Sequence, residues 1–234
     1  MSHNLYPQTE HENANLNSEP QSASLLTSLT VSYSHTVLAK TFPRRIPFTV
    51  IIDTIRTGKG ILDNITTIRA CTVDDERQEL KRKLLPCFSM AQFENNRRLS
   101  KALTSINYLI FDSDHLDKKL AEVRSTLMAD ERVFCLFTSP SGDGLKVIYR
   151  LDTAIRDHVA YSKIYEHYAT TIGQQFNFKC DEKTKDAARL CFLSHDPDIY
   201  VNENNKPLST VIGVQPTNGK ATKTKKTIQQ KLEA

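Results

Sequence analysis

Residues 105–151 read SINYLIFDSDHLDKKLAEVRSTLMADERVFCLFTSPSGDGLKVIYRL. The apolar run at 105–112 is continuous, which predicts a central buried strand. Apolar residues then recur on one helical face over 114–127, which predicts an amphipathic helix. A strand, a dense turn signal and an alternating strand follow, at 132–138, 139–144 and 145–151.

The same alternation of elements continues to about residue 200. A long amphipathic helix is predicted over 153–176 and a last strand over 189–195. The order β-α-β-β-α-β predicts an α+β fold with a ferredoxin-like or RNA-recognition-like (RRM) core over about 105–200. In that core the strand order is 4-1-3-2, and one face of the sheet stays open. An N-terminal α/β extension is predicted from a strand and two helices, at 28–35, 47–58 and 74–85.

This topology gathers charged residues at one end of the open face. Asp112 and Asp114 end the first strand, and two residues apart in an extended chain they face the same side. Lys146 lies near the start of the third strand, on the side opposite its apolar residues. Asp181 and Arg189 stand just before and at the start of the last strand. Carboxylates and cations are therefore expected to meet there.

Paired aspartates at a strand end suit Mg²⁺ or Mn²⁺, which take oxygen ligands, and Asp181 could complete a two-metal site. The turn and its neighbour offer hydroxyls, backbone N–H groups and a cation to phosphates, through Ser139, Ser141, Gly142, Gly144 and Lys146. Each signal alone has an ordinary explanation: a surface pair of aspartates, a hairpin turn, a solvated lysine, or an Arg189 paired with Asp186 or Asp181. Their convergence is what indicates nucleotidyl transfer.

Three segments are distinctive: FDSDHL (111–116), SPSGDGLKVIY (139–149) and DEKTKDAARLCFLSHDPDIYVN (181–202). They resemble the primase-polymerase domains of the archaeo-eukaryotic primase (AEP) superfamily, and the resemblance covers roughly residues 45–205. KRKLLPCFSMAQFENNRR (81–98) also resembles the VirE N-terminal-type domains of Bacteroidota replication and mobile-element proteins. RLCFLSHDPDIYVN is the most specific of these motifs and D-x-D the least.

The resemblance implies a role for each matching residue. Asp112 and Asp114 match the first metal-binding motif, and the segment 139–146 matches the nucleotide-phosphate motif. Asp181 best matches the third motif, with Asp186 as the competing assignment, and Arg189 is expected to contact the nucleotide. Lys146 is a departure, because many members have His there; a charged lysine binds a triphosphate but is no neutral acceptor.

The implied activity is synthesis of short primers on single-stranded DNA from nucleoside triphosphates. The implied partners are that template, the nucleotides and a replicative helicase, on the same chain or a separate one. The template is expected across the open face and near Arg97, Arg98 and Lys101. Two alternatives remain: a single-stranded nucleic-acid-binding module without chemistry, and an interaction domain of a mobile element with a degenerate site.

The composition limits the classes of protein to which the chain can belong. The chain has 234 residues, 39% hydrophobic and 25% charged, enough apolar residues for a packed core. No stretch approaches the roughly 18 apolar residues of a membrane span, and no secretory signal begins the chain, so a cytoplasmic protein without membrane contact is expected. Five cysteines without a C-x-x-C pair predict reduced, mostly buried thiols.

The net charge of +4 comes entirely from residues 215–234, which hold five Lys and one Glu. We therefore expect a flexible leader (1–24), one primase-polymerase-like domain (25–212) and a basic, disordered tail or linker (213–234). The tail is either a solvated linker or a contact for nucleic-acid phosphates.

Overall fold

The computed structural model describes residues 24–177, 179–180 and 182–212. The α-helices are α1 (Leu25–Ser28), α2 (Phe48–Thr57), α3 (Leu62–Ala70), α4 (Asp74–Leu84), α5 (Leu120–Met128) and α6 (His158–Gln175). The strands are β1 (Thr30–Ser34), β2 (Arg44–Pro47), β3 (Cys87–Ser89), β4 (Gln92–Phe93), β5 (Leu103–Ser113), β6 (Val133–Thr138), β7 (Leu145–Ile155), β8 (Cys191–Phe192) and β9 (Tyr200–Val201). Short 3-10 helices are η1 (Glu94–Asn96), η2 (Ser100–Ala102), η3 (Asp117–Lys119) and η4 (Glu182–Lys185). The predicted leader, except Ser24, and the predicted tail lie outside the described residues.

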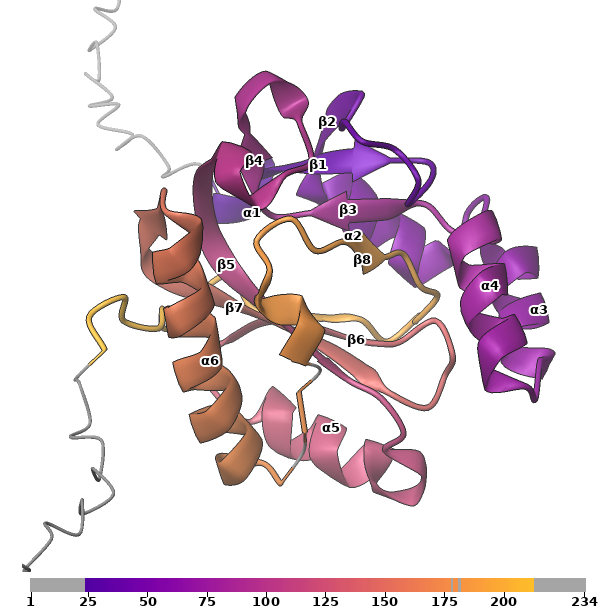
Figure 1. Cartoon of the computed structure of the whole chain (residues 1–234). Helices are drawn as coiled ribbons and strands as arrows, with labels where there is room; N and C mark the ends of the chain where they lie inside the picture. Colours follow the sequence, from indigo (N-terminus) through magenta and orange to yellow (C-terminus); the bar gives the residue numbers. More distant parts are fainter. Residues whose placement is uncertain (1–23, 178, 181, 213–234) are drawn as a thin grey trace, which may run out of the picture.

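The strands form two antiparallel sheets. The larger has the order β4-β5-β7-β6-β9 and the smaller the order β2-β1-β3-β8. In Figure 1 the larger sheet crosses the middle of the molecule, with α5 and α6 below and to the left and the smaller sheet above. The fold is therefore α+β, as the sequence predicts.

The predicted ferredoxin-like strand order holds only for its first three strands. β5, β7 and β6 are neighbours in that order. The expected fourth strand, at 189–195, is wrong in both length and place: only β8 forms, and it pairs with β3 of the smaller sheet. The backbone that follows β8 is held by the N-terminal part, since Leu193 N–H donates to Pro86 O at 3.0 Å and Asp196 N–H to Ile55 O at 2.9 Å. The edge beside β5 is taken by β4 instead.

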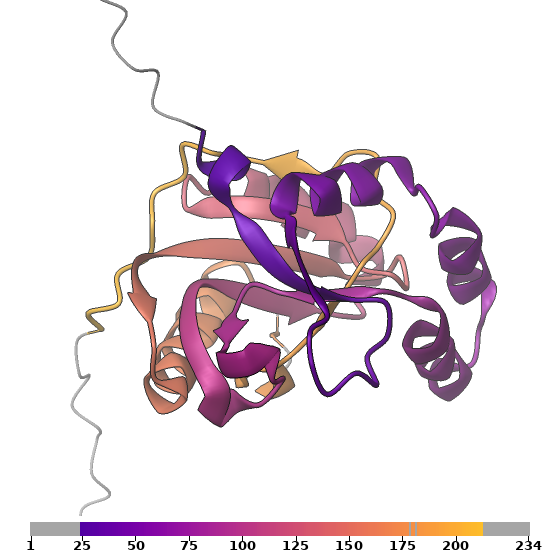
Figure 2. The ribbon, with the colours of Figure 1, turned by 90° about the horizontal axis from the view of Figure 1, so that it is seen from above.

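Both faces of the larger sheet are buried. Leu109 and Phe111 of β5 pack in one apolar core with α5 and α6. Tyr108 of the same strand packs in a second core with β1, α2 and α3. A strand covered on both faces must be apolar throughout, which accounts for the continuous run at 105–112. The predicted open face is therefore wrong: the N-terminal elements, indigo and purple in Figure 2, lie over it.

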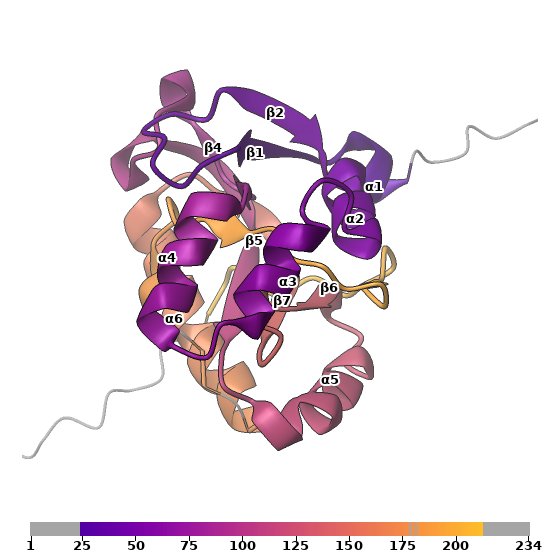
Figure 3. The same ribbon diagram turned by 90° about the vertical axis from the view of Figure 1, so that its right-hand side faces the viewer.

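Helices α3 and α4 lie side by side at the edge of this N-terminal layer (Figure 3). The sequence predicted α2 and α4 but missed α3, because its β-branched residues are weak helix formers. α2 ends at Gly58, whose φ of +69° suits a residue without a Cβ. α4 has three acidic residues in its first turn and three basic ones in its last, which matches the helix dipole.

The five cysteines are free thiols, four of them buried, as predicted. In the described part of the chain, no helix has the length and apolar character to cross a membrane.

Candidate active site

An ion pair between neighbouring strands lies at the centre of the predicted site. Antiparallel pairing places Asp112 of β5 directly opposite Lys146 of β7. The Lys146 ammonium donates to Asp112 Oδ2, and the lysine is only 5% exposed. Burial alone would lower the pKa of Lys146, but the nearby Asp112 charge outweighs it and holds that pKa above the ordinary lysine value. Lys146 is therefore a charged, buried group and not a solvated one.

The turn from Ser139 to Gly144 packs against the paired aspartates. Its ends are joined by Ser139 N–H donating to Gly144 O at 2.8 Å. A Cβ on Gly144 would lie 2.3 Å from Ser113 O and 3.0 Å from Asp114 Cα. Only glycine fits that approach. The phosphate-type turn and the D-x-D segment are therefore in direct backbone contact.

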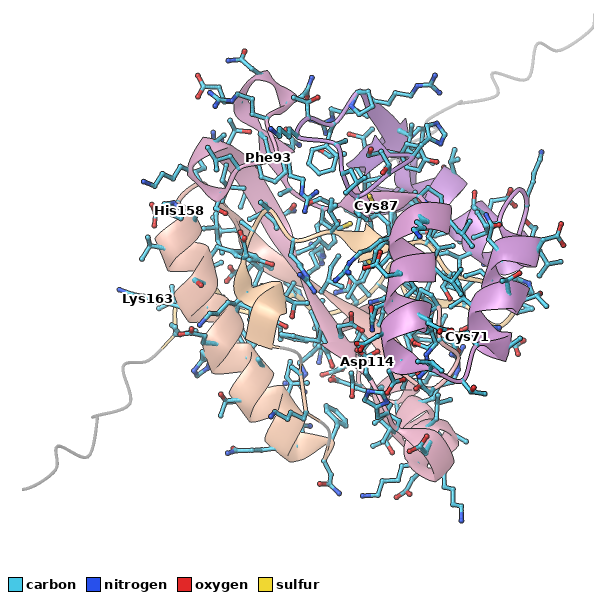
Figure 4. All side chains as sticks on the ribbon, turned by 45° about the vertical axis from the view of Figure 1, so that its right-hand side comes forward. Cys71, Cys87, Phe93, Asp114, His158 and Lys163 are labelled. Atoms are coloured by element: carbon cyan, nitrogen blue, oxygen red, sulfur yellow. The ribbon has the colours of Figure 1, made fainter. Side chains whose placement is uncertain are left out.

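Asp114 lies where β5 ends, beside α4 (Figure 4). The residue is exposed, and the charges of Asp112, Lys146 and Lys81 act on its carboxylate. Desolvation raises the pKa of Asp114, and the neighbouring Asp112 raises it further, while Lys146 and Lys81 act in the opposite direction. The prediction that these two carboxylates face one region is consistent with this mutual repulsion.

Two cations that the sequence analysis missed reach the turn from α3 and α4. Arg69 donates to the carbonyls of His195 at 2.7 Å and Pro140 at 3.4 Å. Lys81 donates to Ser141 Oγ at 2.8 Å. Lys81 stands in the quoted segment 81–98, but a helix so rich in charge gave no sign of which residue is buried. The N-terminal extension thus contributes to the site directly.

Arg189 lies close to the ion pair, although the strand expected to begin at this residue does not form there. A pocket beside the ion pair is lined by Asp112, Lys146, Asp186 and Arg189, among others. The carboxylate of Asp186 accepts a hydrogen bond from the Ser100 hydroxyl and another from Ala188 N–H at 2.9 Å. Asp186 therefore already stabilises its own loop. Asp181, the preferred third carboxylate, lies outside the described residues.

The donor groups at the D-x-D end fit a hard cation. Asp112 Oδ1 is buried without a hydrogen-bond partner, and so is Asp143 Oδ1 in the adjoining turn. Unpartnered buried carboxylate oxygens are costly, and a divalent cation would satisfy them. Among the described residues, however, no group of three His, Cys, Asp or Glu side chains is close enough to form a metal site. These residues would supply only part of such a site.

A buried carboxylate from the motif at 189–202 fixes the start of the turn. Asp196 accepts from Thr138 N–H at 2.7 Å and Arg124 Nη1 at 2.8 Å. Burial would raise its pKa, but these hydrogen bonds offset the burial and leave the pKa of Asp196 below the ordinary value. Thr138 directly precedes Ser139, so this motif holds the turn in place. That role was not predicted.

Comparisons with known proteins agree with the motifs. Residues 79–201, just over half of the chain, match the family described as BT4734-like, N-terminal domain. No curated protein sequence matches significantly.

Two solved structures are similar to the chain. One is the AEP domain of the cyanophage S-2L primase-polymerase, at 13% identity, a TM-score of 0.38, and 59% of this chain and 73% of that chain covered. The other is the polymerase domain of Mycobacterium tuberculosis ligase D in complex with DNA, at 10% identity, a TM-score of 0.35 and 50% of this chain covered. The chain spans about half of that second structure, 49%. Likenesses this weak support no conclusion on activity.

Proposed function

The chain belongs to the BT4734-like N-terminal domain family, and from the geometry of its site we propose that it performs template-directed nucleotidyl transfer. The product is a short primer, made on single-stranded DNA from nucleoside triphosphates. The observation that carries the proposal is the backbone contact of Gly144 with Ser113 and Asp114. It places a turn suited to phosphate directly against the paired carboxylates, and the reaction needs these groups close together.

In this proposal Asp112 and Asp114 hold Mg²⁺ or Mn²⁺, with Asp181 as the third ligand. A cation bound there would activate the 3′-hydroxyl of the growing chain and stabilise the pyrophosphate leaving group. The 3′-oxygen bonds to the α-phosphorus, the bond from that phosphorus to the β-phosphate oxygen breaks, and the hydroxyl proton passes to solvent.

The remaining predicted residues bind the nucleotide. The hydroxyls of Ser139 and Ser141 and the N–H group at Gly144 are hydrogen-bond donors suited to phosphate oxygens. Gly142 contributes by shaping the turn, because its N–H donates to Ser139 O at 2.9 Å. Lys146 and Arg189 line the adjoining pocket with Asp112 and supply positive charge there. Because Lys146 is paired with Asp112, it must exchange that carboxylate for phosphate when nucleotide and cation bind.

The template is proposed to follow exposed cations on two N-terminal loops, since the face expected to bind it is covered. The loops are joined by the pairing of Thr41 with Arg97. The exposed cations on the loops are Lys40 and Arg97, and Arg44 and Arg45 of β2 and Lys101 of η2 are exposed next to them along the chain. Arg98 instead points to backbone carbonyls, including Ala188 O at 3.4 Å, so it holds the loops together. Phosphate contacts of this kind give binding with little sequence preference.

The test is labelled-primer synthesis on single-stranded DNA without a primer, in Mg²⁺ or Mn²⁺. We compare the wild type with the double variant Asp112→Ala plus Asp114→Ala, and with Asp53→Ala, an exposed aspartate on α2, as the matched control. Products from the wild type and the control alone are expected. Equal product from the double variant would contradict the proposed site.

A second candidate function is a nucleic-acid-binding module without chemistry. It is favoured by the ion pair that Lys146 makes with Asp112, which places an ammonium where a cation would bind. Its signature is binding of single-stranded DNA that needs no divalent cation and is unchanged by Asp112→Ala. Primer synthesis by the wild type would exclude it.

A further inference from the structure

Helix α4 is unusual in what it buries. Within this helix, the only buried residue is Lys81, which is 5% exposed. Its apolar residues Leu80 and Leu84 are only half-buried, and its neighbours Arg82 and Lys83 are exposed. Helices normally pack an apolar stripe against the core, because burying a lysine removes its charge from water. A buried lysine in this position is costly unless an acceptor, from the protein or from a ligand, satisfies its ammonium group.

The Lys81 ammonium reaches the turn and not a carboxylate. Its one hydrogen bond among the described residues is to Ser141 Oγ, at 2.8 Å. Burial lowers the pKa of Lys81, while Asp114 is the largest influence in the opposite direction. Yet no described carboxylate forms a direct ion pair with it, whereas Lys146 is paired with Asp112. A neutral hydroxyl satisfies only one of the three donors of an ammonium group.

Lys81 is also not needed to shape the turn. The turn is closed by its own backbone, through Ser139 N–H to Gly144 O at 2.8 Å and Gly142 N–H to Ser139 O at 2.9 Å. Arg69 contacts the turn from outside, by donating to Pro140 O at 3.4 Å and Ser139 O at 3.5 Å. Lys81 differs from Arg69 because it contacts a side-chain hydroxyl of the turn and not a backbone carbonyl. Its spare donors lie beside the turn's hydroxyl.

We propose that Lys81 is a phosphate-binding residue, which with the Ser141 hydroxyl takes the terminal phosphates of a nucleoside triphosphate. The inference rests on the proposed function and adds a specificity element to it: the site distinguishes a triphosphate from a monophosphate through a lysine of the N-terminal extension. A phosphate oxygen is the strong charged acceptor that the Lys81 ammonium lacks.

The test is calorimetric binding of ATP, ADP and AMP, in Mg²⁺, to the whole chain. Lys81→Met removes the charge and keeps the length of the side chain. Lys83→Met is the matched control, because it removes the same charge from the exposed face of the same helix. Loss of a charged hydrogen bond weakens binding about 10-fold to 100-fold. We expect a weakening of this size for ATP in Lys81→Met, a change under about 2-fold for AMP, and no change in Lys83→Met.

The outcomes separate this inference from the proposed function. If Lys81→Met binds ATP as well as Lys83→Met does, or loses ATP and AMP equally, Lys81 is a structural residue and the inference is overturned. A wild type that binds ATP no better than AMP overturns it too. If the ATP preference depends on Lys81 but the wild type makes no primer, the proposed function fails and the inference stands. Should Lys81→Met not fold, Ser141→Ala at the half-buried turn must lower ATP affinity selectively, and unchanged affinity overturns the inference.

Discussion

Replacement of Lys146 by methionine tests the electrostatics of the site without assuming any activity. The substitution keeps the volume of the side chain and removes its charge. Asp112 then loses its ion-pair partner while most of its side chain stays buried, since the side chains of Lys146 and Asp112 are 6% and 18% exposed in the pair. Breaking a buried pair from one side costs about 3–5 kcal/mol, because the other charge stays buried.

The size of the loss has an upper bound that depends on pH. A buried aspartate without a partner can bind a proton, and at pH 7 this costs about 4 kcal/mol, because the ordinary aspartate pKa is about 3.9 and each pH unit is worth about 1.36 kcal/mol. At pH 5 the same protonation costs only about 1.5 kcal/mol. We therefore expect Lys146→Met to lose about 3–4 kcal/mol of unfolding free energy at pH 7 and about half of that or less at pH 5.

The assay is urea unfolding of four proteins at both pH values: wild type, Lys146→Met, Asp112→Asn and the double variant. Replacing both partners of a buried pair is often nearly neutral, so the double variant should be more stable than either single variant at pH 7. Lys83→Met, at an exposed position, controls for loss of a lysine. A loss under about 1 kcal/mol in Lys146→Met, or a loss that does not shrink at pH 5, would refute the reasoning.

Two further predictions concern the turn. Gly144→Ala places a Cβ 2.3 Å from Ser113 O, so the turn or the D-x-D segment must shift. We expect a loss of about 1–3 kcal/mol in urea unfolding and a sharp drop in primer synthesis. An unaffected variant would show that the two segments are not tightly packed. Asp196 has a lowered pKa, so its contribution is complete above about pH 4 and disappears as pH falls through the folded-state pKa. Asp196→Asn should therefore lose about 1.5–3 kcal/mol at pH 7, a deficit that shrinks in acid unfolding curves; a deficit independent of pH would contradict this role.

The local parts of the fold were readable from the sequence because they depend on neighbouring residues. The continuous apolar run and the alternating segment predicted β5 and β7. The expected strand order, in which the first strand lies beside the third, placed Asp112 near Lys146, as the register confirms. The SPSGDG turn was equally local. Gly144 was assigned to it correctly, although the reason, contact with Ser113, needs the structure.

The packing between distant segments could not be predicted from the sequence, because local patterns do not show which element covers which face of a sheet. The alternation in β7 correctly separated Lys146 from the apolar side but could not show that a second sheet buries it. The segment at 189–195 looks like a strand, yet Leu193 and Asp196 are held by the N-terminal layer. Lys81 is one of many charged residues in α4, and only the packing of the helix shows that it is the buried one.

The most direct measurement of the central claim is a crystal structure grown with Mn²⁺ and ATP, with Mn²⁺ located by its anomalous scattering. The account predicts Mn²⁺ bound by the carboxylates of Asp112 and Asp114, with the triphosphate along the turn from Ser139 to Gly144 and its terminal phosphates at Lys81. Mn²⁺ and ATP bound elsewhere, with Lys146 still paired to Asp112, would contradict it.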